Sequence, residues 1–160
     1  MKSKIIGALC FAVLAAPVHA ASKPPPASIA AVTAGTLKSE DEVAAFADRV
    51  MQAVSRGDLD AAYRALKNYS VLPGDDVDRG LQASRQQRAA PLFAQRFGAT
   101  VGSEFIGRKK LGQSMLRLTY IERTQKQPLP WAFYFYLTSN GWVLSEFGWS
   151  AQPAALYDAN

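Results

Sequence analysis

Histidine and cysteine, the side chains that most often carry catalysis or bind transition metals, each occur once in this 160-residue chain. They are Cys10 and His19, and both lie in the first twenty residues. Those residues have the layout of a secretory signal, with a positive start, an apolar run and small residues before a cleavage point: Lys2, Lys4, Ile5 to Ala16, Val18 and Ala20. The run is shorter than the ~20 apolar residues that span a bilayer. We therefore expect cleavage between Ala20 and Ala21 and a periplasmic or secreted protein without a transmembrane segment.

Removal of residues 1–20 takes two of the 18 basic side chains and none of the 13 acidic ones, which leaves a net charge of +3. The remaining chain has no histidine and no cysteine. Nucleophilic catalysis by cysteine or a Ser–His pair, histidine general bases, and His/Cys zinc or copper sites all lack an essential residue. We expect no metal, no cofactor and no disulfide, so that stability comes from burial of apolar surface.

Among the carboxylates, Glu146 stands out by its spacing. Strand alternation places it on the same face as Trp142 and Leu144, where burial would raise the pKa of the carboxyl group. Two other interpretations stay open. The strand end is twisted outward and Glu146 is solvated, or Glu146 pairs with an arginine such as Arg117.

Arg85 and Arg88 lie beside an apolar stripe on the helical wheel of a segment that starts near Asp75. One interpretation is that both side chains bury their stems and reach water with their guanidinium groups. The other is that one arginine guards the mouth of a cavity and pairs with an anionic group of a ligand.

Basic residues are concentrated between positions 79 and 110, where seven of them accompany a single acid, Glu104. They are Arg79, Arg85, Arg88, Arg96, Arg108, Lys109 and Lys110. Such a segment attracts anionic surfaces such as lipid headgroups and envelope polymers, although most segments of this kind are solvated faces. No nucleic acid is expected as a partner, because no recognised binding motif is present.

Four parts follow from the composition. They are a signal peptide (1–20), a Pro/Ala/Ser/Thr-rich linker (21–38), one domain (39–152) and a short tail (153–160). A capping box at Ser39 opens a first helix that ends at Gly57, and Asp58 caps a second. Residues 69–72 favour a short strand. A third helix is predicted from Asp75 or Asp76 to Phe97, with Pro91 kinking or dividing it.

The second half of the domain reads as four strands rich in aromatic and branched residues, at 100–108, 114–123, 131–138 and 142–150. Asn140-Gly141 is a hairpin signal. In the third strand Trp131 and Phe133 share a wholly apolar face, so we expect both near the centre of the core. The pattern predicts an α+β domain with helices packed on a curved antiparallel meander of four to five strands.

This order of elements resembles the nuclear-transport-factor-2-like superfamily and its small exported bacterial members. The last two predicted strands resemble them in sequence as well, over Trp131 to Tyr136, Gly141 to Leu144 and Phe147 to Trp149. The resemblance implies a cone-shaped fold with a substrate site between helices and sheet. It also implies acid–base pairs of a carboxylate with tyrosine or histidine. Candidates for that chemistry are Glu104, Glu122, Glu146, Tyr120, Tyr134 and Tyr136, of which Glu146, Tyr120 and Tyr134 are preferred.

Two classes of function stay open. The first is a non-catalytic envelope protein that binds a small apolar or anionic ligand, or a protein partner, through residues such as Arg85, Arg88, Trp142 and Glu146. The second is a cofactor-free isomerase or cyclase that uses a Glu–Tyr pair. An open pocket where these two groups converge would favour the enzyme, and an interior filled by side chains would favour binding. A homodimer is compatible with either class.

Overall fold

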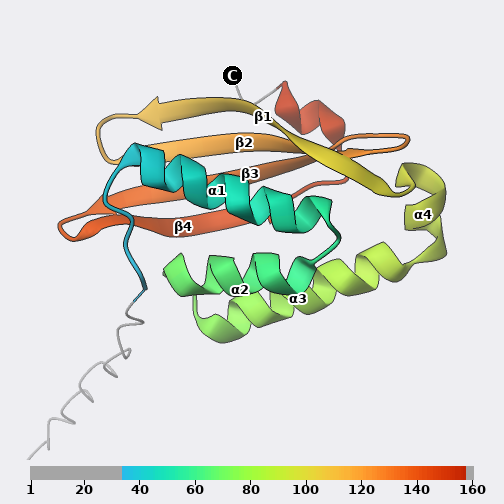
Figure 1. Cartoon of the computed structure of the whole chain (residues 1–160), viewed down its shortest axis with the longest axis horizontal. Coiled ribbons are helices and arrows are strands. Elements are labelled where there is room, and N and C mark those ends of the chain that lie inside the picture. Colours follow the sequence, from blue (N-terminus) through green and yellow to red (C-terminus); the bar gives the residue numbers. More distant parts are fainter. Residues whose placement is uncertain (1–33, 158–160) are drawn as a thin grey trace, which may run out of the picture. The chain divides into compact units, whose positions relative to one another are not determined.

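The computed structural model describes residues 34–157, and the predicted signal peptide and most of the predicted linker lie outside this range. Four helices come first, followed by four strands and a short 3₁₀ helix, as Figure 1 shows. The elements are α1 (Glu40–Ser55), α2 (Leu59–Tyr69), α3 (Gly74–Ala89), α4 (Pro91–Phe97), β1 (Thr100–Leu111), β2 (Met115–Thr124), β3 (Leu129–Thr138), β4 (Gly141–Trp149) and η1 (Pro153–Leu156). The predicted α+β architecture is confirmed.

The first two helices begin at the predicted caps. The Ser39 hydroxyl accepts a hydrogen bond from the Glu42 amide at 3.1 Å, and an Asp58 carboxylate oxygen accepts one from the Ala61 amide at 2.9 Å. The Glu42 side chain reaches back to the Lys38 amide at 2.7 Å. These bonds satisfy amides that have no partner within a helix.

Pro91 divides the third predicted helix, as expected. Helix α3 ends at Ala89, Ala90 is extended, and Pro91 occupies the first turn of α4, where its missing amide costs nothing. The break changes the helical phase. Leu92 is 75% exposed, whereas the next residue, Phe93, packs against the rings of Phe97 and Trp149.

All four strands are antiparallel and neighbours in sequence are neighbours in space, in the order β1-β2-β3-β4. Strand β1 runs to Leu111, three residues beyond its predicted end, because Lys109 and Lys110 pair with Arg117 and Leu116 of β2. The register shifts twice in β1 and once between Tyr134 and Phe135 of β3. Each shift is a β-bulge, which bends the strand and changes which face the following side chains take.

Within the described residues, the longer helices lie on one face of the sheet, the inner face, whereas the opposite, outer face carries only the short η1, which packs against β3. Helix α1 packs over this inner face, and α2 and α3 lie beside it (Figure 1). The predicted core residues Trp131 and Phe133 are completely buried there, and the neighbouring Phe135 meets the Phe46 ring of α1 edge-on. The interior between helices and sheet is therefore occupied by bulky side chains. Within residues 34–157, no helix is long and apolar enough to cross a membrane.

The packed part of the chain starts before the predicted end of the linker. Leu37 is buried and exchanges two backbone hydrogen bonds with Trp142 of β4, at 2.9 and 2.8 Å. Gly141 permits this approach, because a Cβ there would lie 2.6 Å from the Leu37 carbonyl oxygen and its φ is +130°. The predicted strand near residue 70 is reduced to one bridge, between Ser70 and Leu144.

Candidate functional site

Glu122 is the buried carboxylate of the inner face, and its side chain is completely inaccessible. The Arg88 guanidinium of α3 holds it with two bonds, from Nη1 to Oε1 at 2.7 Å and from Nη2 to Oε2 at 2.6 Å. Thr100 of β1 donates to Oε1 at 2.6 Å, and the Trp131 indole of β3 donates to Oε2 at 3.0 Å. Each carboxylate oxygen thus accepts two hydrogen bonds.

These four hydrogen bonds determine the protonation state of Glu122. Burial alone raises the pKa of a carboxyl group, but the hydrogen bonds and charge of Arg88, helped by Thr100 and Trp131, outweigh it and hold the pKa of Glu122 below its ordinary 4.5. A carboxylate in this state is a poor general base, because its lone pairs are occupied and its proton affinity is low. Glu122 therefore has a structural role. We call Glu122 and its three partners, Arg88, Thr100 and Trp131, the anchor.

Arg88 is the centre of the anchor, because both of its terminal nitrogens are bonded to Glu122. Its side chain is 15% exposed, and its guanidinium carbon lies 4.8 Å from the centre of the Trp149 ring and 5.5 Å from that of Phe93. The guanidinium group points inward to Glu122, so the interpretation that it reaches out into water is wrong, and the anionic partner that Arg88 has in this structure is a residue of the chain itself. Its anion is Glu122, and the charge is buried between aromatic faces.

The anchor continues into a short polar chain. The Trp149 indole donates to the Ser84 hydroxyl at 2.9 Å, and that hydroxyl lies 2.6 Å from the hydroxyl of Tyr63 on α2. Every strand contributes one residue to this cluster: Thr100, Glu122, Trp131 and Trp149. The cluster joins the end of α3 to one end of the sheet, and it offers no unoccupied catalytic group.

Three further residues predicted for the site are also engaged elsewhere. Arg85 is half-exposed on α3 and forms an ion pair with Asp60 of α2. Trp142 is 4% exposed and belongs to the core, so it has little surface to offer a ligand. Tyr120 is buried and donates to Asp48 of α1 at 2.7 Å. Burial, and next the hydrogen bond and charge of Asp48, raise the pKa of Tyr120 above its ordinary range.

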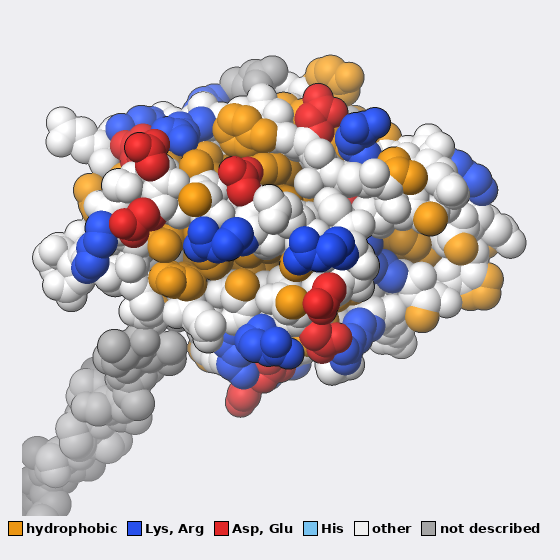
Figure 2. Space-filling view, in the orientation of Figure 1, with side chains coloured by type: hydrophobic (Ala, Val, Ile, Leu, Met, Phe, Trp, Pro, Cys, Tyr) orange, Lys and Arg blue, Asp and Glu red, His pale blue; other side chains and the backbone are white. Residues whose placement is uncertain are grey.

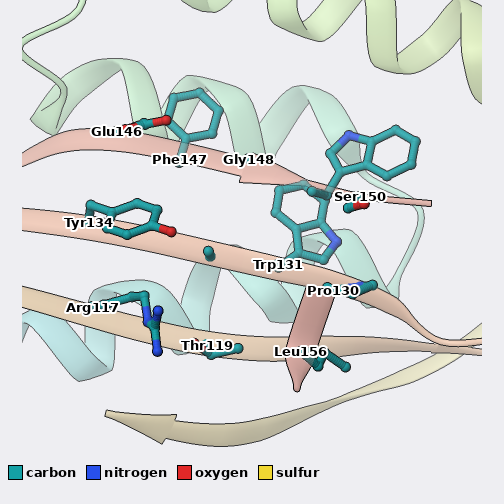
Figure 3. A pocket seen from close by; sticks show the side chains of 12 residues that line it. Arg117, Thr119, Pro130, Trp131, Tyr134, Glu146, Phe147, Gly148, Ser150 and Leu156 are labelled. Carbon is teal, nitrogen blue, oxygen red and sulfur yellow. The ribbon is translucent and has the colours of Figure 1, made fainter. Parts of the chain in front are cut away.

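Glu146 lies on the opposite, outer face of the sheet and is exposed. Simple alternation fails here because the bulge between Tyr134 and Phe135 leaves Ser145 without a partner, so Leu144 pairs with Phe135 and Glu146 with Tyr134. The pairing continues to Arg117 of β2. Figure 3 shows Arg117, Tyr134 and Glu146 next to each other on three neighbouring strands.

The outer face carries three adjoining hollows of about 260, 270 and 370 Å³, all lined by Arg117. We call them together the outer groove. The first is lined by Thr119, Ala132, Tyr134 and Glu146, with Leu156 of η1 beside them (Figure 3). The second lies against Ile106 to Lys109 of β1. The third is the most apolar and is lined by Leu111, Met115 and Tyr134 beside Lys109.

The basic segment is divided by the fold. Arg85 and Arg88 lie on α3 in ion pairs, whereas Lys110 of β1 binds Glu40 of α1 at 2.6 Å, with Arg108 at 3.4 Å. The Lys110 ammonium group lowers the pKa of Glu40. Figure 2 shows acidic and basic side chains interspersed on the face in view. The predicted flank of Arg85, Arg88, Lys109 and Lys110 is thus not one surface, and Lys109 is its member on the outer groove.

Sequence reasoning missed both the anchor and the groove. The partners of Glu122 are Arg88, Thr100 and Trp131, at sequence separations of 34, 22 and 9 residues, and such separations leave no local signal. The groove had a local signal, because the apolar alternation of Leu116, Leu118 and Tyr120 requires Arg117 and Thr119 to face outward. Among the described residues, no group of three His, Cys, Asp or Glu side chains is placed to hold a metal ion.

Comparison with known proteins gave no match: no family model matches this chain, and neither a curated protein nor a solved structure matches it significantly. The geometry of the described residues therefore carries the functional interpretation.

Proposed function

We propose that this protein is an exported, non-catalytic binding domain of the cell envelope, and that its ligand binds in the outer groove. The observation that carries the proposal is the contrast between the two faces. The inner face is filled by side chains such as Phe133 and Phe135, whereas three hollows meet around Arg117 on the outer face, which carries only the short η1. Ligand sites are concave and combine apolar surface with a few polar groups.

Membership of the nuclear-transport-factor-2-like superfamily is part of this proposal. Helices followed by an antiparallel four-strand meander agree with it. The resemblance implies a ligand between helices and sheet, but that space holds the anchor and the aromatic core in this chain. A member of the superfamily with a filled interior needs another surface for binding, and the outer groove supplies one.

The enzymatic alternative has one observation in its favour, which is that Tyr134 and Glu146 are direct partners across β3 and β4. Their setting argues against it. Glu146 is exposed, whereas acid–base catalysis by a carboxylate depends on a site that excludes water and shifts its pKa. The buried candidates Glu122 and Tyr120 are bound to Arg88 and Asp48, respectively.

The lining of the groove indicates the class of ligand. Its largest hollow combines Leu111, Met115 and the Tyr134 ring with the basic side chains Lys109 and Arg117. Apolar surface gains free energy when it is covered, at about 25 cal/mol per Å², and cations select an anionic group. The ligand proposed is a small molecule with an apolar part and one anionic group.

Binding of laurate, a carboxylate with a single alkyl chain, tests this proposal. The titration is done at laurate concentrations below the critical micelle concentration. We expect saturable binding by isothermal titration calorimetry, and about tenfold weaker binding by Lys109→Glu, because the charge beside the carboxylate is reversed. Lys126→Glu is the matched control, since Lys126 is exposed on the β2–β3 turn and binds the Gln95 carbonyl oxygen. Equal loss in both variants, or no binding by the wild type, would contradict the proposal.

Export is tested separately, because residues 1–33 lie outside the described range. N-terminal sequencing of protein recovered from its native cells should give a chain that starts at Ala21. Recovery of membrane-embedded chain that still begins at Met1 or Lys2 would remove the export model and leave the groove unaffected.

A further inference from the structure

The two edges of the sheet differ in how they are covered. On the β4 edge, Leu37 pairs with Trp142, and the Val71 amide donates to the Leu144 carbonyl oxygen at 3.0 Å. On the β1 edge, no backbone bridge is formed within residues 34–157. An uncovered edge presents amides and carbonyl groups that pair readily with another strand.

Strand β1 also concentrates exposed apolar side chains. Of the nine large hydrophobic residues that are exposed in the described part of the chain, four lie on this strand: Val101 (57%), Phe105 (49%), Ile106 (45%) and Leu111 (74%). An edge strand of twelve residues with this much exposed apolar surface is unusual for a protein that stays monomeric. We propose that β1 pairs antiparallel with β1 of a second copy of this chain, across a two-fold axis.

Charge determines the register of this pair. Glu104 and Lys109 both lie on the outer face, since their partners in β2 are Ile121 and Arg117. In a two-fold antiparallel pair that keeps outer residues opposite outer residues, Glu104 of one copy lies opposite Lys109 of the other. Symmetry forms this contact twice, and opposite charges across a strand pair stabilise it.

The same register suits the other side chains of β1. Phe105 then lies opposite Arg108 of the second copy on the inner face, and Ser103 lies opposite Lys110. Ile106 lies opposite Gly107, which leaves room for it. A register shifted by two residues loses the Glu104–Lys109 contacts, and a shift of one residue places inner side chains against outer ones. The three consecutive basic residues 108–110 therefore protect the edge from other pairings while permitting this one.

The dimer is expected to be weak. A single pair of strands covers less than the ~800 Å² per partner of a standard interface, so association should depend on concentration in the ordinary working range. Its consequence concerns the outer groove, because Ile106, Gly107 and Lys109 line the groove at the β1 edge. The second copy would place its Glu104 beside Lys109 and continue the groove across the two-fold axis. The pairing does not depend on the proposed ligand.

Sedimentation velocity over a wide range of protein concentration tests the pairing. We expect a reversible monomer–dimer equilibrium whose dissociation constant rises about tenfold or more in Glu104→Lys, since two attractive contacts become repulsive. Lys109→Glu should have the same effect. The double variant Glu104→Lys/Lys109→Glu should restore the wild-type constant, because the exchange rebuilds both contacts.

Two controls make the result decisive. Arg64→Glu reverses an exposed charge on α2 and should leave the equilibrium unchanged, and circular dichroism should show that every variant is folded. A wild type that stays monomeric at all concentrations, or a double variant that fails to regain dimerisation, overturns the proposal. Within one copy Glu104 lines none of the three hollows, so laurate binding by Glu104→Lys at concentrations where it is monomeric tests the groove apart from the dimer.

Discussion

A glutamate on the inner face of the sheet and one on the outer face have opposite surroundings. Glu122 faces inward, is completely buried and is held by four hydrogen bonds. Glu146 faces outward, is exposed and lies opposite Tyr134. The alternation of side chains along a strand therefore does not by itself identify a functional carboxylate. The position of a bulge and the supply of partners from distant elements decide whether the carboxylate anchors the fold or lies open to a ligand.

The largest expected difference between the faces concerns two neighbours in β3. Phe133 is completely buried against the rings of Tyr120 and Trp131, so Phe133→Ala should lower the free energy of unfolding by about 3–5 kcal/mol. Tyr134 lies half-buried on the outer face, and Tyr134→Ala should cost about 1 kcal/mol. Urea denaturation measures both. Similar midpoints for the two variants would mean that the faces are assigned wrongly.

The second difference concerns the two glutamates. Glu122→Gln leaves the buried Arg88 guanidinium without a compensating charge, which typically costs about 3 kcal/mol. Glu146→Gln changes an exposed side chain and should stay within about 0.5 kcal/mol of the wild type. Thermal denaturation at neutral pH compares them. The double variant Arg88→Met/Glu122→Leu should recover part of the loss, because an apolar pair of similar volume leaves no buried charge.

The dependence of stability on pH also tests the role of Glu122. Since the pKa of Glu122 is below 4.5 in the folded protein, the unfolded chain takes up the proton first as pH falls. The stability contributed by Glu122 is therefore complete above pH 4.5 and is lost as pH falls through the lower pKa of the folded state. Urea midpoints measured below neutral pH should fall less steeply in Glu122→Gln than in the wild type. Parallel slopes in the two proteins would show that Glu122 is not the ionised anchor.

Elements with local signals were predictable from the sequence, and contacts between distant elements were not. The caps at Ser39 and Asp58, the break at Pro91 and the hairpin at Gly141 depend on residues within a few positions of each other. The α+β architecture follows from these signals together with the alternating aromatic and branched residues of the four strands. The burial of Arg88 and its ion pair could not be predicted, because its partner Glu122 is 34 residues away.

The solvated state, one of the interpretations left open for Glu146, is confirmed, but the face that simple alternation gave it is wrong for a different reason. One extra residue in β4, Ser145, reverses the face of the side chains that follow it. A bulge has no strong sequence signature here, since no glycine marks it. The outer groove was partly predictable, as Arg117 follows from alternation, but Leu156 reaches it from a segment that composition assigns to a tail.

The central claim is that ligands bind to the outer face of the sheet and not between helices and sheet. Amide chemical-shift mapping by NMR during a titration with laurate tests it most directly. The account predicts that the shifts concentrate at Lys109 and Leu111 of β1, Arg117 of β2 and Tyr134 of β3, and leave Phe46, Val50 and Leu66 in the helices nearly unchanged. Shifts concentrated at these helix residues would place the ligand in the interior and contradict the account.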